Sequence, residues 1–384
     1  MLASAGVRIA RIPRGPLFSM FLFTLLLSIL IPLLIPYFPQ SSSTVNNFLQ
    51  RNLFNVSKRH FVSDSQTSSH GYQSGNSQSG SQSNGQQTTS DSSGPFTYKS
   101  SVAYQPKDRD DAIYQKLKDS LLSPTGEDNY FITTNSVSDV YAGVADGVGG
   151  WAEHGYDSSA ISRELCKAMD QLSGSLTTDL SKSKISNLIV TPKEIIDLAY
   201  NKIKDEKIVE VGGTTAIIAH FPQDGLLKVA NLGDSWCGVF RDSKLVFQTK
   251  FQTVGFNAPY QLSIIPEEME RQARLSGRSY IQNIPKDADE YEFQLNSKDV
   301  VILATDGVTD NIATDDIELF LKDNQELLSN DLNKTSKTLV QNIVKLSKDP
   351  EYPSVFAQEI SKLSGKLYKG GKEDDITMVL VKVD

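Results

Sequence analysis

Short apolar runs separated by polar turns dominate the sequence from about residue 126 to its end. Val140–Ala145, Leu226–Leu232, Val300–Thr305 and Ile376–Val383 contain few polar side chains, and such runs of four to eight residues are typical of buried strands. Hairpin-length gaps separate several of them, as at Val137-Ser138-Asp139. Further strands are predicted at Tyr130–Asn135, Thr214–Phe221, Cys237–Arg241, Lys244–Gln248 and Tyr291–Leu295, the last pairing with Val300–Thr305.

Apolar side chains at helical spacing lie between these strands. Asp157–Leu172 has this spacing, and Thr191 with Pro192 provides a cap and a first residue for a helix over Lys193–Glu206. Three more helices are predicted, a short one from Thr314 to Lys322 and two longer ones at Asp331–Lys348 and Pro353–Leu367. Strands with hairpin-length gaps and helices grouped between them predict an α+β fold with antiparallel sheets.

Acidic side chains stand at the ends of four apolar runs. Asp146 and Asp306 each follow a run and precede a glycine, whereas Glu127-Asp128 and Asp374-Asp375 each precede a run. Pairing of the strands could bring these ends together, and clustered carboxylates then need a cation. Carboxylate and carbonyl oxygens are the ligands that Mg²⁺ and Mn²⁺ prefer. The pattern therefore predicts a metal site at one end of the strands.

The N-terminal region differs from the rest in composition. Residues 17–38 are uncharged and almost all apolar, and as a helix they would span about 33 Å, enough for a hydrocarbon core of roughly 30 Å. We expect a transmembrane helix there, with a long signal peptide as the alternative. Residues 1–62 carry arginines but no Asp or Glu, which is typical of a mitochondrial presequence.

Two further segments follow this region. Residues 63–94 consist mostly of Ser, Gln, Gly and Asn, a composition that cannot bury enough apolar surface to fold, so we expect a disordered tether. Residues 95–384 are predicted to form the folded domain. Up to residue 94 the chain has six basic and two acidic side chains, and the remainder has 32 basic and 44 acidic ones. An acidic body argues against a nucleic-acid partner.

Only two cysteines occur, Cys166 and Cys237, and they fall in a predicted helix and a predicted strand. They form no disulfide framework, and we expect both to be small core residues.

Six motifs then point to a family: Gly126-Glu127-Asp128-Asn129, Asp146-Gly147-Val148-Gly149-Gly150, Gly212-Gly213-Thr214-Thr215-Ala216, Asn231-Leu232-Gly233-Asp234-Ser235, Ala304-Thr305-Asp306-Gly307-Val308-Thr309-Asp310 and Asp374-Asp375-Ile376-Thr377. In this order they resemble the metal-dependent type 2C protein phosphatases. Asp146–Trp151, Phe256–Ile264 and Lys372–Thr377 are similar to the mitochondrial type 2C phosphatase seven subfamily of fungi and animals, which is linked to coenzyme Q biosynthesis.

The resemblance implies two antiparallel sheets packed as a sandwich, with helices on both outer faces. It also implies a protein serine/threonine phosphatase in which two Mg²⁺ or Mn²⁺ ions activate a water molecule for attack on phosphorus. By motif position, Asp146 would bridge both ions, the Gly147 carbonyl would bind one of them, and Asp306 and Asp374 would hold the other. Three further acids would lie behind these ligands: Glu127, Asp128 and Asp375. Asp234 and Asp310 are expected to support the turns.

Two positions depart from the pattern of this family. Many members have an arginine that grips the substrate phosphate where this chain has Ser123, and a histidine that serves as general acid where it has Val148. His154 could reach the site from its loop or lie in solvent. Four residues are open as the phosphate-gripping arginine: Arg241, Arg271, Arg274 and Arg278.

Two functions from different classes follow. The first is a phosphatase that acts on phosphoproteins in mitochondria, anchored to a membrane through residues 17–38, with the nuclear envelope or endoplasmic reticulum as the alternative compartment. The second is a membrane-tethered pseudophosphatase that binds partners without turnover. The four acid-bearing turns favour the enzyme, because like charges that cluster without a function would destabilise the fold.

Overall fold

The computed structural model describes residues 95–108, 123–180 and 190–384. The predicted transmembrane helix over residues 17–38, the presequence-like segment 1–62 and the tether 63–94 lie outside these residues. Among the described residues, no helix combines the length and the apolar character needed to cross a membrane.

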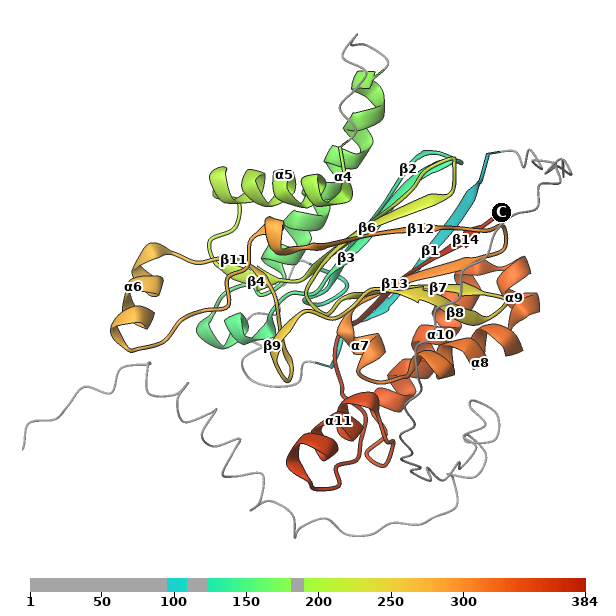
Figure 1. Ribbon diagram of the computed structural model, residues 1–384. Helices are drawn as coiled ribbons and strands as arrows, with labels where there is room; N and C mark the ends of the chain where they lie inside the picture. Colours follow the sequence, from blue (N-terminus) through green and yellow to red (C-terminus); the bar gives the residue numbers. More distant parts are fainter. Residues whose placement is uncertain (1–94, 109–122, 181–189) are drawn as a thin grey trace, which may run out of the picture. The chain divides into compact units, whose positions relative to one another are not determined.

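Two five-stranded antiparallel sheets form the centre of the fold (Figure 1). The first sheet has the order β1 (Tyr98–Gln105), β14 (Ile376–Val383), β13 (Val300–Ala304), β7 (Trp236–Arg241) and β8 (Lys244–Gln248). The second has the order β12 (Asp289–Gln294), β6 (Leu226–Leu232), β5 (Ala216–Phe221), β3 (Asp139–Ala145) and β2 (Asn129–Ser136).

The two sheets pack face to face. Alternate residues of β3, Val140, Ala142 and Val144, point into a core that they share with β13 and β14 side chains such as Leu303 and Val379. The residues between them point outward, which is why nearly all of β3 is buried although its side chains alternate between two faces. This arrangement is the sandwich that the family resemblance implied.

Helices cover both outer faces of the sandwich (Figure 1). On the second sheet, α4 (Ala160–Leu180) and α5 (Pro192–Asp205) bury side chains such as Ile161 and Ile196 against Tyr141. On the first sheet, α10 (Leu332–Ser347) packs against β1 and β14, and α8 (Thr314–Asp323) approaches β8. The four-layer α+β prediction is confirmed.

The remaining elements connect these layers: η1 (Gly149–His154), β4 (Gly212–Thr214), β9 (Thr253–Gly255), β10 (Ala258–Pro259), β11 (Leu262–Ile264), α6 (Glu267–Leu275), η2 (Pro285–Asp287), α7 (Asp306–Thr309), α9 (Gln325–Asn330) and α11 (Val355–Ser364). Short strand pairs β4–β11 and β9–β10 lie outside the two main sheets.

Local chemistry accounts for most element boundaries. The Thr191 hydroxyl accepts a hydrogen bond from the Glu194 backbone N–H, and the Glu194 carboxylate accepts one from the Thr191 N–H, so α5 begins with a complete capping box. Asp331 caps α10 in a similar way, through the backbone N–H of Lys334. Of these two helices, only α5 was predicted from its capping residues.

Some predicted elements were wrong in detail. The predicted pair of Tyr291–Leu295 with Val300–Thr305 does not form, because β12 pairs with β6 and β13 pairs with β7 and β14. The short loop between them crosses from one sheet to the other, and an Asp299 carboxylate oxygen accepts a hydrogen bond from the Asn296 N–H within it. A short connection therefore does not guarantee a hairpin.

Two other predictions needed correction. The predicted strand Thr214–Phe221 is divided into β4 and β5, because Thr215 turns its backbone N–H toward the Asp146 carbonyl. The helix predicted at Asp157–Leu172 begins later, at Ala160, since the Asp157 carboxylate accepts hydrogen bonds from Ser159 before the helix starts.

Both cysteines lie in the core, as predicted. Cys166 of α4 is 2% exposed and Cys237 of β7 is fully buried. Burial raises the pKa of both thiols, to about 12 for Cys237. Neither sulfur is placed to act as a nucleophile.

Candidate metal centre

The four acid-bearing turns meet at one end of the sandwich. Asn129 pairs with Ala145 across β2 and β3, so Asp128 and Asp146 emerge side by side from the second sheet. Ala304 pairs with Met378 across β13 and β14, so Asp306 and Asp374 emerge together from the first. The packing of the two sheets then brings both pairs to the same end.

Direct hydrogen bonds join the turns of the two sheets. The Asp375 carboxylate accepts one from the Glu127 backbone N–H at 2.8 Å and another from the Lys107 N–H at 2.9 Å. The Thr305 hydroxyl donates to the Asp128 carboxylate at 2.8 Å. Asp375 therefore acts mainly as a clamp between turns, since both of its oxygens already accept backbone hydrogen bonds.

Eight acids make up what we call the carboxylate cluster: Glu127, Asp128, Asp146, Asp234, Asp306, Asp310, Asp374 and Asp375. Burial and the charges of Asp306 and Asp128 raise the pKa of Asp146 well above its usual range. Burial and the charge of Asp375 likewise raise the pKa of Asp128 well above its usual range. These carboxylates repel one another in the fold, which is the electrostatic condition that a bound cation relieves.

Asp234 and Asp310 belong to the same cluster. Burial and the charge of Asp306 raise the pKa of Asp234 to about 8 and that of Asp310 to about 7. The Asp234 Oδ1 atom is buried and has no hydrogen-bond partner among the residues that the structure describes. A buried carboxylate oxygen without a partner is costly unless a cation or a proton satisfies it.

Two lysines, which the sequence analysis did not single out, lie among these acids. Lys107 Nζ lies 3.0 Å from Glu127 Oε2 and 3.0 Å from Asp374 Oδ1. Lys372 Nζ lies 2.6 Å from Asp306, 2.5 Å from Asp310 and 3.2 Å from Asp374. Burial alone would lower the pKa of Lys372, but the surrounding carboxylates raise it well above its ordinary value. Burial would raise the pKa of Asp374, but the two ammonium groups hold it below its usual value.

Within residues 95–108, 123–180 and 190–384, no three Asp, Glu, His or Cys side chains already converge as metal ligands. The side chains of the cluster nevertheless fit a hard divalent cation, because they supply carboxylate oxygens. The turns are packed closely enough to require glycine. A Cβ atom on Gly147 would lie 2.6 Å from the Glu127 carbonyl oxygen, and one on Gly307 would overlap the Asp375 carbonyl.

Four of the five residues considered for phosphate binding and proton transfer, all except Arg278, have their contacts outside the carboxylate cluster. Arg241 forms a bidentate pair with Asp299, at the opposite end of β13 from Asp306. Arg271 and Arg274 pair with glutamates of their own helix α6. His154 is exposed at the end of η1 beside the Trp151 ring. Among these four side chains, the structure brings none to the cluster.

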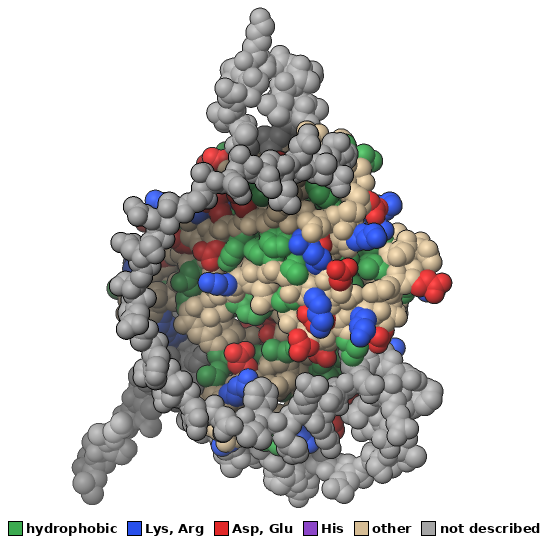
Figure 2. Space-filling view, turned by 45° about the vertical axis from the view of Figure 1, so that its right-hand side comes forward, with side chains coloured by type: hydrophobic (Ala, Val, Ile, Leu, Met, Phe, Trp, Pro, Cys, Tyr) green, Lys and Arg blue, Asp and Glu red, His purple; other side chains and the backbone are tan. Residues whose placement is uncertain are grey.

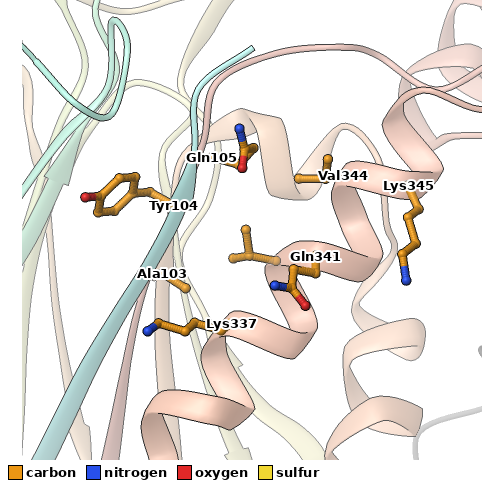
Figure 3. A pocket seen from close by; sticks show the side chains of 8 residues that line it. Ala103, Tyr104, Gln105, Lys337, Gln341, Val344 and Lys345 are labelled. Atoms are coloured by element: carbon orange, nitrogen blue, oxygen red, sulfur yellow. The ribbon is translucent and has the colours of Figure 1, made fainter. Parts of the chain in front are cut away.

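A separate groove of about 400 Å³ lies between β1 and α10 (Figure 3). Tyr104 and Gln105 line it from the strand, and Lys337, Gln341 and Lys345 line it from the helix. None of its lining residues belongs to the carboxylate cluster. On the face shown in Figure 2, acidic and basic side chains are interspersed, without a continuous basic surface.

Comparisons with known proteins agree with this fold. A family profile described as Stage II sporulation protein E (SpoIIE) matches residues 136–384. The chain is 62% identical to "Protein phosphatase 2C homolog 7, mitochondrial" of Saccharomyces cerevisiae, with both chains covered completely. It is 34% identical over 256 residues to "Protein phosphatase PTC7 homolog" of Danio rerio, which covers 66% of this chain and 80% of that one.

A solved structure has the same fold. The photosystem II phosphatase PBCP superposes with a TM-score of 0.55 at 24% identity, covering 75% of this chain and 99% of its own.

Proposed function

The chain belongs to the type 2C family of protein phosphatases, and on this premise we propose that it hydrolyses phosphoserine and phosphothreonine in proteins with two Mg²⁺ or Mn²⁺ ions. The observation that carries the metal assignment is the meeting of four acid-bearing turns at one end of the sandwich. When bound, divalent ions supply water of lowered pKa and positive charge opposite the phosphoryl oxygens.

In this proposal each turn contributes one part of the site. By the family motif, Asp146 would be shared by the two ions, and the charges of Asp306, Asp128 and Asp374 all act on its carboxylate. The Gly147 carbonyl, in a turn packed against Glu127, would bind one ion. Asp306 and Asp374, which both contact Lys372, would hold the other.

The acids behind these ligands keep the turns in position. Asp128 is fixed by the Thr305 hydroxyl, and Glu127 accepts a hydrogen bond from the Ser158 hydroxyl at 2.6 Å. Asp375 joins the turn of Glu127 to the turn of Asp374. Such supporting contacts orient metal ligands and bound water before the substrate arrives.

We place this activity in mitochondria, because the relative that matches the full length is named as mitochondrial and because residues 1–62 have a presequence-like composition. The apolar run 17–38 would anchor the catalytic domain to a membrane. Enzymes of coenzyme Q biosynthesis are the substrates we would test first.

The test is phosphate release from a phosphothreonine peptide by the full chain, with Mn²⁺, with Mg²⁺ and with EDTA. We expect release only with added metal, and a loss of at least about 100-fold in Asp146→Asn, since even supporting residues of metal ligands contribute about 10–100-fold.

Asp139→Asn is the matched control for this test. Asp139 lies at the other end of the same strand and bonds to His220 at 2.7 Å, so its replacement should leave the rate of release unchanged. A folded full chain that releases no phosphate at any metal concentration would contradict the proposal and favour the tethered pseudophosphatase.

A further inference from the structure

Lys372 lies among the carboxylates that are proposed to hold the second metal ion. Its ammonium nitrogen is surrounded by carboxylate oxygens of Asp306, Asp310 and Asp374 and by the amide oxygen of Asn257, at 2.5 to 3.2 Å. A shell of side-chain oxygens around one positive charge is the environment that hard cations require.

The backbone of Lys372 is fixed, and its long side chain is partly exposed. The buried side chain of Asn311 accepts a hydrogen bond from the Lys372 N–H at 2.9 Å and donates one to the Lys372 carbonyl at 2.8 Å. The ammonium lies 5.3 Å from the centre of the Phe356 ring, and the side chain is 16% exposed. A four-carbon stem of this kind can swing its charge to the surface while the backbone stays in place.

An ion held by Asp306 and Asp374 could not share these oxygens with Lys372. Mg²⁺ lies about 2.0–2.1 Å from its oxygen ligands, so it would stand against an ammonium that is 2.6 Å from Asp306 Oδ2. The other Asp374 oxygen offers no alternative, because it contacts Lys107 Nζ and the Asp375 N–H, each at 3.0 Å. An ion bound at Asp306 Oδ2 and Asp374 Oδ2 would therefore compete with the ammonium for the same oxygens.

The Asp146 half of the site differs in this respect. Among the described residues, no lysine or arginine nitrogen lies within 4.0 Å of an Asp146 carboxylate oxygen. An ion that binds at Asp306 and Asp374 would therefore compete with the Lys372 ammonium, whereas an ion that binds at Asp146 would not.

We propose that Lys372 is a built-in competitor of the second metal ion. Its ammonium and the ion are alternative occupants of the Asp306–Asp374 half, and the ion binds there only when the Lys372 side chain swings out. The inference rests on the proposed two-metal function and adds a residue that sets the affinity of one site.

The first experiment is calorimetric titration of Mn²⁺ into the metal-stripped full chain. The wild-type chain should bind two ions with unequal affinity. Lys372→Met should tighten the weaker site by about tenfold at unchanged stoichiometry, the gain expected if the ammonium occupies its place about nine-tenths of the time. Lys244→Met is the matched control, because Lys244 pairs with Glu318 outside the cluster, and it should leave both affinities unchanged.

Three results would overturn the inference. An unchanged or weakened second site in Lys372→Met would show that the ammonium does not compete, and an additional bound ion would show that it has a position of its own. A wild-type chain that binds no Mn²⁺ would remove both this inference and the proposed function. The first two results would remove the inference alone, because the wild-type chain would still bind metal.

A second experiment needs no variant. Acetylation of the full wild-type chain with an amine-reactive ester, followed by peptide mass spectrometry, reports the accessibility of each lysine. Saturating Mn²⁺ should increase the labelling rate of Lys372 by about tenfold, for the same reason of occupancy, while that of Lys244 stays constant. An unchanged or reduced rate at Lys372 would contradict the displacement of its side chain.

Discussion

Strand β13 carries an aspartate just beyond each of its ends, and the two have opposite surroundings. Asp299 precedes the strand, is fully buried, and has both oxygens satisfied by the Arg241 guanidinium and the Asn296 N–H. Asp306 follows the strand and lies among other carboxylates, with Lys372 as its cation. The same residue type thus stabilises the fold at one end and belongs to the proposed metal site at the other.

Strand β3 repeats this contrast. Burial would raise the pKa of Asp139, but hydrogen bonds from His220 and Asn135 lower it below its ordinary value. Asp146, just past the other end, has its pKa raised by burial and by neighbouring acids. Asp139 and Asp299 thus have partners that favour their charge, whereas Asp146 has mainly other acids around it, and the contrast distinguishes carboxylates that stabilise the fold from those proposed to bind metal.

The strongest test of this contrast is Asp306→Asn. We expect a loss of phosphatase activity of at least about 100-fold, because a proposed metal ligand is removed. The free energy of unfolding in EDTA should change by less than about 1 kcal/mol, because the loss of the pair with Lys372 is offset by the loss of repulsion between Asp306 and its neighbouring acids, and Lys372 keeps Asp310 and Asp374. Phosphate release and urea unfolding measure the two effects, and a large loss of stability would break the comparison.

Asp299→Asn should lower stability and leave activity unchanged, the reverse of Asp306→Asn. Loss of the charge leaves Arg241 without its bidentate partner, and we expect the free energy of unfolding to fall by about 2–3 kcal/mol, the range for hydrogen bonds to charged groups. Activity per folded molecule should be unchanged below the unfolding transition. Urea unfolding followed by tryptophan fluorescence gives the stability, and a drop in activity at full folding would contradict the structural role.

Thr305→Val tests whether a residue can both stabilise the fold and support metal binding. Thr305 is not a proposed metal ligand, but it lies next to Asp306. Its hydroxyl donates to Asp128 and accepts from the Thr377 N–H at 3.1 Å. We expect a loss of stability of about 1 kcal/mol from these hydrogen bonds and a weakening of Mn²⁺ binding of about tenfold, as for other supporting contacts of metal ligands. Calorimetry that finds unchanged Mn²⁺ affinity would place Thr305 on the structural side alone.

Much of this arrangement could be predicted from the sequence. The apolar runs gave β6, β8 and β14 with their observed bounds, because buried strands leave a strong local signal. Asp146 and Asp306 stood out because a glycine follows each, and the close packing of Gly147 and Gly307 against neighbouring carbonyls explains that requirement. Asp299 flanks the same strand as Asp306, but no glycine follows it, and it lies outside the carboxylate cluster.

The rest depended on contacts between distant parts of the chain. Strand β1 was not predicted, since its alternation of serines with apolar residues is weak and its partner β14 lies at the other end of the sequence. Lys107 and Lys372 are ordinary lysines in sequence, and only the meeting of the turns places them among acids. The one available signal was the position of Lys372 two residues before Asp374, inside a motif already recognised.

The burial of both thiols has a consequence of another kind. A phosphatase that used a cysteine thiolate would lose its activity to peroxide, whereas here the only two cysteines of the chain are enclosed in the core. Oxidants and alkylating reagents can reach Cys166 and Cys237 only when the helix or the sheet around them opens. The rate at which the two thiols react therefore measures how often the structure around them opens.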